Sequence, residues 1–346
     1  MCNIAGYVGS ENASSILIEM TRRQEGYAGG YYTGIATLCD GRIHSAKITG
    51  DLQRLLDKTN AAGLCGSIGL MHSRSKAGGG DEWAHPFLGM RDGEAACAYI
   101  ANGSLGCFAP RLQDNIKLTE ELFDEGYTML SRTRCGDNPK YPTLSDGTAV
   151  HMSDAMCQLI LRNMNGGIEA PVAMEKAFCE MPSEIVGLLL NVDEPNAISW
   201  SRINMPVFVS FARHGAYIAS TPLAFPSDAG EPVLLPAMSS GRIYADHFTV
   251  YPYAEPTASV ARIDARVYHD AYRTVYEYIS EEERKLSDIS KCVKKLFCEA
   301  DCFPTAALVY SILYSFKEQG MLRKRNAIVE GAAKGIDAPL TYVSMN

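Results

Sequence analysis

The apolar and polar positions of the first 256 residues predict short strands interleaved with helices. Strands are expected at 4–8, 35–38, 42–47, 66–72, 95–101, 184–191, 206–211, 216–220 and in the 244–253 region, with Asp40-Gly41 as the hairpin signal before 42–47. Helical spacing of apolar residues is found at 13–23, 51–60, 118–125, 155–163 and 170–180. Strand-rich halves on either side of helical segments predict an α+β domain that ends near Pro256.

Beyond this point the pattern changes to three helical segments followed by a hairpin. The helices are expected at 267–279, 286–298 and 304–319, and the β-like pieces near 327–330 and 340–344. This order matches the outline of a winged helix, so residues 263–346 are expected to form a small helical second domain. The segment carries equal numbers of basic and acidic side chains, whereas DNA-binding domains usually show a basic face. Nucleic-acid binding is therefore not expected.

The composition is that of a globular protein and argues against several kinds of partner. Of the 346 residues, 47% are hydrophobic and 21% are charged, and the net charge of −8 disfavours nucleic-acid or anionic-membrane surfaces. We find neither a secretory signal nor an apolar run long enough to span a bilayer, so we expect a cytoplasmic protein. The 11 cysteines show no repeated spacing and are expected to be reduced thiols. Cys298 and Cys302 are the closest pair, but no histidine cluster accompanies them, so no metal and no cofactor are expected.

Cys2 is the first candidate for chemistry. Removal of Met1, which a small second residue favours, would leave a thiol and a free α-amine on one residue. An α-amine titrates at roughly pKa 7.7 to 8.0, so it can act as general base for its own side chain. The alternative interpretation is an ordinary buried cysteine near an unprocessed end.

Three further positions have both a chemical and a structural interpretation. Arg74 follows a small-residue strand and begins a glycine-rich loop, which suits an anion site or, alternatively, an exposed linker. Asn102 and Gly103 end another strand, either as a tight turn or as two hydrogen-bond donors for one developing oxyanion. Asp154 starts a helix, where an acid is most often a cap or a partner of the helix dipole.

The order of these residues resembles a known family. The matching motifs are Met-Cys-x-Ile-x-Gly at the start, His72-x-Arg74 after a strand, then His85-Pro86 and Asn102-Gly103. This arrangement resembles the glutaminase domain of class II, N-terminal-nucleophile glutamine amidotransferases, as found in glucosamine-6-phosphate synthase. The similar spacing runs from Cys2 to about Tyr253.

The resemblance implies a fold, a reaction and a set of site residues. The fold would be the four-layer αββα sandwich of N-terminal-nucleophile hydrolases over residues 1–256, and the reaction would hydrolyse L-glutamine to glutamate and ammonia. The implied residues are Cys2 as nucleophile, Asn102 and Gly103 as oxyanion donors, Arg74 for the substrate's α-carboxylate, Asp154 for its α-ammonium, and His85 as a further substrate-binding residue. Asp154 is reached only across an apparent insertion at about 133–150.

Departures from the family leave other functions open. Asn3 stands where the family usually has glycine, and Ser75, Ala77 and Gly78 replace the Trp, Thr and His of glucosamine-6-phosphate synthase. The residues after about 256 are too few for that enzyme's isomerase domains. We therefore expect a synthase partner protein or a homo-oligomer that forms through the C-terminal domain. The alternatives are a catalytically weak glutamine-sensing protein and an N-terminal-nucleophile amidase for a different amide.

Overall fold

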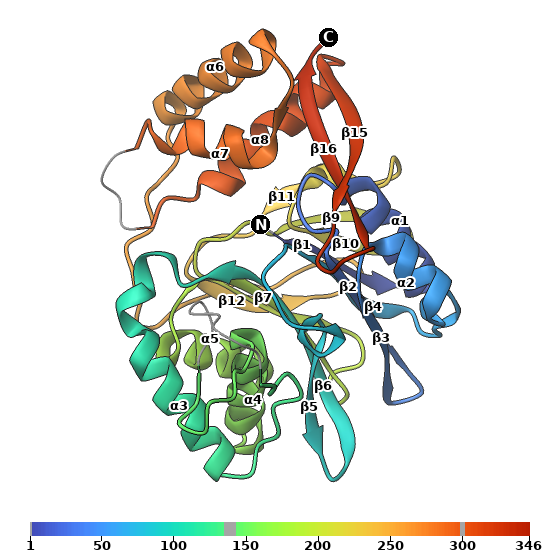
Figure 1. Cartoon of the computed structure of the whole chain (residues 1–346), viewed down its shortest axis with the longest axis vertical. Coiled ribbons are helices and arrows are strands. Elements are labelled where there is room, and N and C mark those ends of the chain that lie inside the picture. Colours follow the sequence, from blue (N-terminus) through green and yellow to red (C-terminus); the bar gives the residue numbers. More distant parts are fainter. Residues whose placement is uncertain (1, 135–142, 298–301) are drawn as a thin grey trace.

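Two antiparallel sheets lie face to face at the centre of the molecule (Figure 1). The structure is a computed structural model that describes residues 2–134, 143–297 and 302–346. The first sheet has seven strands in the order β11 (Val233–Leu234), β9 (Phe208–Ala212), β10 (Gly215–Ala219), β1 (Asn3–Gly9), β4 (Ile68–Arg74), β2 (Tyr32–Cys39) and β3 (Arg42–Thr49). The second has six in the order β13 (Tyr251–Pro252), β12 (Ser239–Ile243), β8 (Ile198–Arg202), β7 (Glu184–Asn191), β6 (Glu94–Ser104) and β5 (Phe87–Arg91). Buried aliphatic side chains of both sheets, such as Ile4 and Leu188, fill the space between them.

Helices cover the outer face of each sheet. The seven-stranded sheet is covered by α1 (Ala13–Gln24) and α2 (Leu52–Lys58), and the six-stranded sheet by α4 (Met152–Asn165) and α5 (Ala170–Glu180), with α3 (Leu112–Asp124) beside α4. Short 3₁₀ turns complete this part: η1 (Ala61–Gly63), η2 (Asp81–Trp83), η3 (Gly106–Arg111) and η4 (Pro222–Ala224). No helix among the described residues has the length and apolar character needed to cross a membrane.

The helices and strands predicted from periodicity are mostly present, and one of the missed strands has a clear cause. The helix predicted at 170–180 matches α5, and α3 begins six residues before the predicted 118. We did not predict β5, β8 or β12. The sequence of β12 is Ser-Ser-Gly-Arg-Ile, and it is almost fully buried although it contains only one large apolar residue. Strands whose buried positions are filled by serine and glycine give no apolar run to detect.

The C-terminal residues form a helical module with a long hairpin. In order it consists of α6 (Ala265–Glu281), β14 (Arg284–Lys285), α7 (Leu286–Lys294), α8 (Thr305–Glu318), β15 (Leu322–Glu330) and β16 (Asp337–Met345), and its sheet has the order β14-β16-β15. The helix predicted at 286–298 ends at Lys294, and residue 298 lies outside the described residues.

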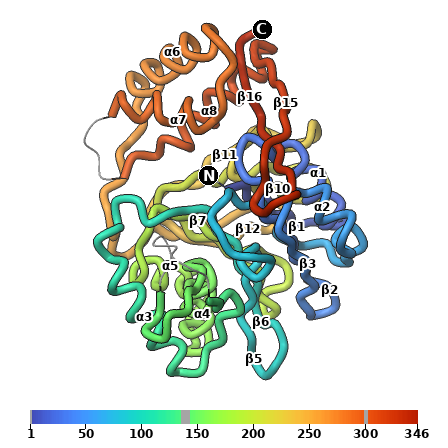
Figure 2. Tube along the Cα trace, viewed as in Figure 1, coloured from blue at the N-terminus to red at the C-terminus, as the bar shows by residue number. Residues whose placement is uncertain are grey.

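This module packs directly on the first part of the chain. Buried residues of α8, such as Leu308 and Ile312, belong to the same apolar cluster as Leu17 of α1. The hairpin reaches down beside α1 and α2 (Figure 2), and Thr341 N donates to Gly26 O at 2.9 Å. The tail is therefore packed against the loop that follows α1.

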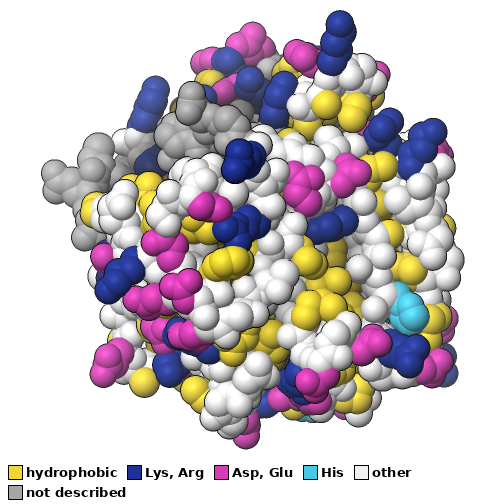
Figure 3. All heavy atoms as spheres, turned by 60° about the horizontal axis from the view of Figure 1, so that its bottom comes forward, with side chains coloured by type: hydrophobic (Ala, Val, Ile, Leu, Met, Phe, Trp, Pro, Cys, Tyr) yellow, Lys and Arg dark blue, Asp and Glu magenta, His cyan; other side chains and the backbone are white. Residues whose placement is uncertain are grey.

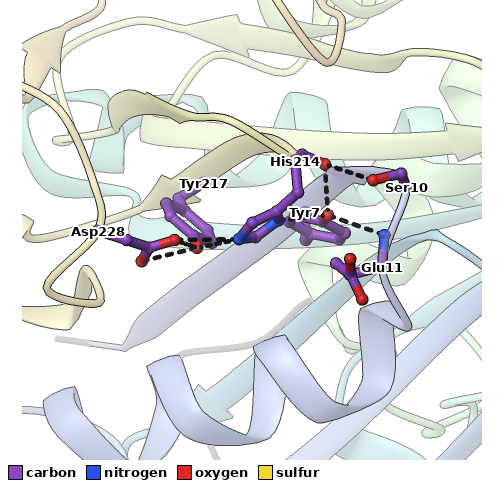
Figure 4. A network of polar contacts seen from close by, with 6 residues as sticks. All are labelled: Tyr7, Ser10, Glu11, His214, Tyr217 and Asp228. Carbon is purple, nitrogen blue, oxygen red and sulfur yellow. Dashed lines mark hydrogen bonds and ion pairs between the residues drawn. The ribbon is translucent and has the colours of Figure 1, made fainter.

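A polar network fixes the far end of β1 (Figure 4). Tyr7 Oη donates to His214 O at 2.8 Å and lies 2.9 Å from His214 Nδ1. Asp228 completes the network, because its carboxylate accepts from Tyr217 Oη at 2.9 Å and lies 3.0 Å from His214 Nε2. The strand that follows Cys2 is thus anchored at its opposite end to the turn between β9 and β10.

A disulfide joins Cys39 to Cys65, with a Cα–Cα distance of 5.8 Å. The expectation of reduced thiols was wrong for this pair, while Cys2, Cys97, Cys107, Cys157, Cys179 and Cys292 are free. The two residues are 26 positions apart, but β2 and β4 are neighbours in which Leu38 lies opposite Ile68. Strand pairing brings the two cysteines together, and cysteine spacing alone does not report it.

Candidate active site

A cavity of about 550 Å³ lies where the ends of three strands meet. Cys2 immediately precedes β1, Arg74 ends β4, and Gly103 is near the end of β6, and all three line this cavity. Because β1 and β4 are antiparallel neighbours, the start of one lies beside the end of the other. The sheet thereby brings residues 2 and 74 together.

Asn102 holds the backbone of Cys2. Its Oδ1 accepts a hydrogen bond from Cys2 N at 3.3 Å. This bond leaves the side-chain amide nitrogen, Nδ2, buried and without a hydrogen-bond partner in the protein. A buried donor without a partner costs free energy, which a ligand oxygen at this position would recover.

The Cys2 thiol is acidic for a cysteine. Burial by itself would raise its pKa, but His72, the N-terminal charge and the Ser75 backbone together lower the pKa to about 6. The thiol sulfur lies 3.7 Å from Ser75 Oγ. Because the thiolate is the nucleophilic form, Cys2 is reactive at neutral pH.

The side chain of Asn3 points away from this chemistry. Its Nδ2 donates to the carbonyl oxygens of Gln24 and Ala28, on the α1 side of the sheet. Successive side chains of a strand face opposite sides, so the residue beside the nucleophile is directed away from the cavity. The replacement of glycine by Asn3 therefore does not fill the site.

Arg74 contributes a buried positive charge at the cavity wall. Its guanidinium donates to Trp83 O at 2.8 Å and to Gly78 O at 3.1 Å, and it lies over the Tyr32 ring at 4.4 Å. These contacts fix the planar group, which suits it to the charge-assisted recognition of a carboxylate. The loop after Arg74, whose residues differ from the family pattern, also lines the cavity with Ser75, Lys76 and Ala77.

His85 lines the cavity as a neutral imidazole. Burial and, less strongly, the nearby cationic groups hold its pKa well below the ordinary histidine value. Both ring nitrogens are buried without a hydrogen-bond partner in the protein. A neutral ring in this position can donate one hydrogen bond to a polar ligand and accept another.

Asp154 does not line the cavity, and neither does Asn102, although Asn102 bonds to Cys2 N. The Asp154 side chain is fully buried, its Oδ2 accepts from Ser131 N at 2.7 Å, and its Oδ1 accepts from Gln158 Nε2 at 3.2 Å. Burial raises the pKa of this carboxyl. Its neighbours Met152 and Ser153 line the cavity instead. The cap of α4 is His151, whose Nδ1 accepts from Ser153 N at 3.1 Å, whereas Asp154 bonds to Ser131 and Gln158 inside the protein.

Two histidines that we did not assign a role also belong to the site. His151 lines the cavity, and His72 stacks on His85 with ring centroids 3.9 Å apart. His72 was visible in the sequence only as part of the motif with Arg74. Nothing in the local sequence marks His151, which enters the site because α4 begins at the cavity.

Among the described residues, one group of side chains could hold a metal ion. The donor atoms of Cys107, Glu184 and Cys302 lie within 4.8 Å of one another, and the two sulfurs are 2.9 Å apart. Closed structural zinc sites use four ligands, and the described residues provide three. Cys298, the sequence neighbour considered with Cys302, lies outside the described residues.

Comparisons with known proteins give a consistent result. No protein-family model matches the chain. The isomerizing glutamine–fructose-6-phosphate aminotransferase of Pyrococcus horikoshii is 25% identical over 252 residues, which are 72% of this chain and 37% of that protein. The protein of the same name from Synechocystis sp. is 33% identical over 135 residues, which are 38% of this chain and 20% of that protein.

A solved structure shares the fold. Glutamine phosphoribosylpyrophosphate amidotransferase from B. subtilis superposes with a TM-score of 0.58 at 14% sequence identity, covering 84% of this chain and 55% of that one. The chain spans about a third of the length of the curated relatives that match most of it. In sequence the chain is similar to glutamine–fructose-6-phosphate aminotransferases and in fold to a glutamine amidotransferase, and these likenesses together support an N-terminal-nucleophile glutaminase domain.

Proposed function

We propose that this chain hydrolyses the side-chain amide of L-glutamine to glutamate and ammonia, with Cys2 as the nucleophile. One observation carries the proposal: Asn102 binds Cys2 N through Oδ1 while its buried Nδ2 has no partner. A carbonyl oxygen of a substrate attacked by Cys2 would supply that partner. The name of the sequence relatives, glutamine–fructose-6-phosphate aminotransferase, supports glutamine as the amide.

The reaction follows from these positions. The Cys2 thiolate attacks the amide carbon, and the resulting oxyanion accepts hydrogen bonds from Asn102 Nδ2 and the Gly103 backbone amide. In the protein without Met1, the α-amine of Cys2 gives a proton to the departing nitrogen. Ammonia then leaves a thioester, and a water molecule hydrolyses the thioester to release glutamate. Each oxyanion donor of this kind contributes about 3 to 4 kcal/mol to the barrier reduction.

The substrate's charged end would be held at the wall of the cavity. Arg74 would bind the α-carboxylate, and in doing so it would exchange its contact with Gly78 O for one with the ligand. His85 would hydrogen-bond a polar group of the same substrate. Asp154 would bind the α-ammonium of the substrate only in a conformation in which the first turn of α4 rearranges.

Active-site labelling tests the proposal directly. The purified protein is incubated with a diazoketone analogue of glutamine, and its intact mass is measured. We expect one adduct on Cys2, none in Cys2→Ala, and unchanged labelling in Cys179→Ala, which removes a partly exposed free thiol elsewhere. An adduct that persists in Cys2→Ala overturns the assignment. Met1 retained in protein from its native host would remove the α-amine from the mechanism.

We infer two domains with distinct folds. The helices on both outer faces of the paired sheets support an αββα sandwich for residues 1–256. The order helix, strand, two helices and hairpin supports a winged-helix-like domain for residues 263–346. A cytoplasmic location stays a prediction from the sequence.

The tail is suited to protein contacts more than to nucleic acid. In helix-turn-helix proteins the last helix enters the major groove, whereas α8 is buried against the first part of this chain. Elsewhere on the molecule, on the face shown in Figure 3, which brings the bottom of Figure 1 forward, basic side chains are scattered among acidic ones. The tail would therefore contact a synthase partner or a second copy of this chain.

A glutamine-sensing protein is the second candidate. The burial of Asp154, with both oxygens bonded inside the protein, favours it, because the substrate's ammonium then lacks its expected partner. Steady-state release of glutamate separates the two functions. An enzyme turns over many times, whereas a sensor binds glutamine, measured by calorimetry, without turnover.

A further inference from the structure

The segment of residues 81–86 carries one wall residue of the substrate cavity and supports another. His85 lines the cavity directly. The carbonyl oxygen of Trp83 accepts a hydrogen bond from Arg74 Nη1 at 2.8 Å, and Arg74 also lines the cavity. The places of two cavity residues therefore depend on where the backbone of this segment lies.

Lys47 of β3 binds this segment at three points. Its Nζ donates to Ala84 O at 2.9 Å and to Glu82 O and Pro86 O at 3.3 Å each. An ammonium group has three N–H donors and no acceptor, so three carbonyl oxygens satisfy it completely. One side chain thus fixes the backbone on both sides of His85.

The seven-stranded sheet is shaped to receive the same backbone. Lys47 lies opposite Gly34 on β2, and Gly34 lies opposite His72 on β4, so the three positions form one row across neighbouring strands. Residues directly opposite each other project from the same face of a sheet. A Cβ atom at Gly34 would collide with His85 O, and the His72 ring stacks on the His85 ring with centroids 3.9 Å apart. The backbone of His85 therefore rests on this row, between an anchoring ammonium and a stacked ring.

Other contacts hold different parts of the segment. Thr49 N donates to Asp81 Oδ1 at 2.6 Å, and Trp83 Nε1 donates to Ser131 O at 2.8 Å. These bonds fix the start of the segment and one side chain, whereas Lys47 fixes the carbonyl groups around His85. Lys47 itself lies outside the cavity lining, so it acts on a bound substrate only through the segment.

We propose that Lys47 is a positioning residue, which holds residues 82–86 so that Arg74 and His85 keep their places at the substrate cavity. Without the ammonium group, three carbonyl oxygens lose their donor, and the segment would shift toward water or toward other donors. Arg74 would then lose the fixed acceptor at Trp83 O, and the His85 ring would lose its fixed place. The inference rests on the proposed function, in which Arg74 and His85 bind polar groups of the substrate.

The kinetics of Lys47→Met measure the effect on the substrate. This variant removes the ammonium group and keeps a long apolar stem. Its KM for glutamine, from steady-state glutamate release, should rise roughly 10-fold, with kcat within about threefold of the wild type, because the residues that it positions bind substrate and transition state alike. The matched control is Arg42→Met, which removes a positive charge from an exposed position of the same strand and should leave KM unchanged.

Hydrogen exchange measures the position of the segment without glutamine. The amides of Trp83 and Ala84 form hydrogen bonds within residues 80–84, and their exchange reports local opening. In Lys47→Met, mass spectrometry of the peptide that covers residues 80–86 should show faster exchange than in the wild type and in Arg42→Met. Strands β1 and β4 should exchange as in the wild type.

Three results overturn the proposal. The first is unchanged exchange at residues 80–86 in Lys47→Met. The second is a lower kcat with an unchanged KM, which would place the effect at the chemical step. The third is faster exchange throughout the seven-stranded sheet, the sign of a purely structural role. If Lys47→Met does not fold, Lys47→Gln is measured in the same two ways. Its amide can donate to two of the three carbonyl oxygens, so it should show smaller changes in the same direction.

The two measurements separate this inference from the proposed function. If the wild type releases no glutamate while exchange at residues 80–86 still rises in Lys47→Met, the glutaminase is lost and Lys47 remains the anchor of the segment. If the wild type releases glutamate and neither measurement changes in Lys47→Met, the glutaminase stands and the positioning role falls.

Discussion

Replacing Glu25 with Gln should change how the stability of this protein depends on pH. Glu25 caps the end of α1, and its Oε1 accepts from Ser73 Oγ at 2.9 Å and from Leu52 N at 3.0 Å. Burial, together with the charge of Asp51, raises the pKa of Glu25 to about 7. The carboxyl is therefore protonated in the folded protein at pH 5 and ionised at pH 8.

The size and sign of the effect follow from linkage. A carboxyl whose pKa is higher in the folded state stabilises the fold fully below its unfolded pKa, and this contribution is lost as the pH rises through 7. With pKa values of about 7 folded and about 4.5 unfolded, the wild type loses about 2.5 kcal/mol between pH 5 and pH 8. Glu25→Gln has no such proton and should not share this loss.

Urea unfolding at pH 5, 6, 7 and 8 tests the prediction. The free energy of unfolding of Glu25→Gln minus that of the wild type should increase by about 2.5 kcal/mol over this range. Taking the difference cancels the other titrating groups. Glu19→Gln, an exposed carboxylate on the same helix, is the control and should follow the wild type. A difference for Glu25→Gln that stays constant from pH 5 to pH 8 would refute the reasoning.

Three further changes have expected outcomes. Asn102→Ala should lower kcat for glutamine hydrolysis by about 100- to 1,000-fold with thiol alkylation retained, and a wild-type kcat would exclude Asn102 from the oxyanion site. Arg74→Ala should raise KM for glutamine roughly 10- to 100-fold through loss of a charged hydrogen bond, which steady-state kinetics would measure against Lys76→Ala. Cys39→Ser should lower the free energy of unfolding by about 3 to 4 kcal/mol, because the disulfide closes a 26-residue loop. Equal urea midpoints for Cys39→Ser and the wild type without reductant would contradict the last prediction.

Local sequence patterns were sufficient to predict many of the helices and strands of this protein. The apolar spacing of residues 13–23 and 170–180 predicted α1 and α5, because amphipathic periodicity is a property of neighbouring residues. The resemblance in turn implied that Cys2, Arg74, His85 and Gly103 act together, and all four line one cavity.

Only the tertiary structure decided the interactions that depend on strand pairing and on the packing of one sheet against the other. His72 is 70 positions from Cys2 in the sequence, yet the register of β1 and β4 places both on one face, and Ala101 on the opposing sheet fixes the ring. Asp154 matched the family pattern and is nevertheless buried outside the cavity lining, because the first turn of α4 directs it toward Ser131. The sequence by itself determined the helices and the residue types of the site. The fold decided which of those residues meet, since register and packing join positions that no local pattern connects.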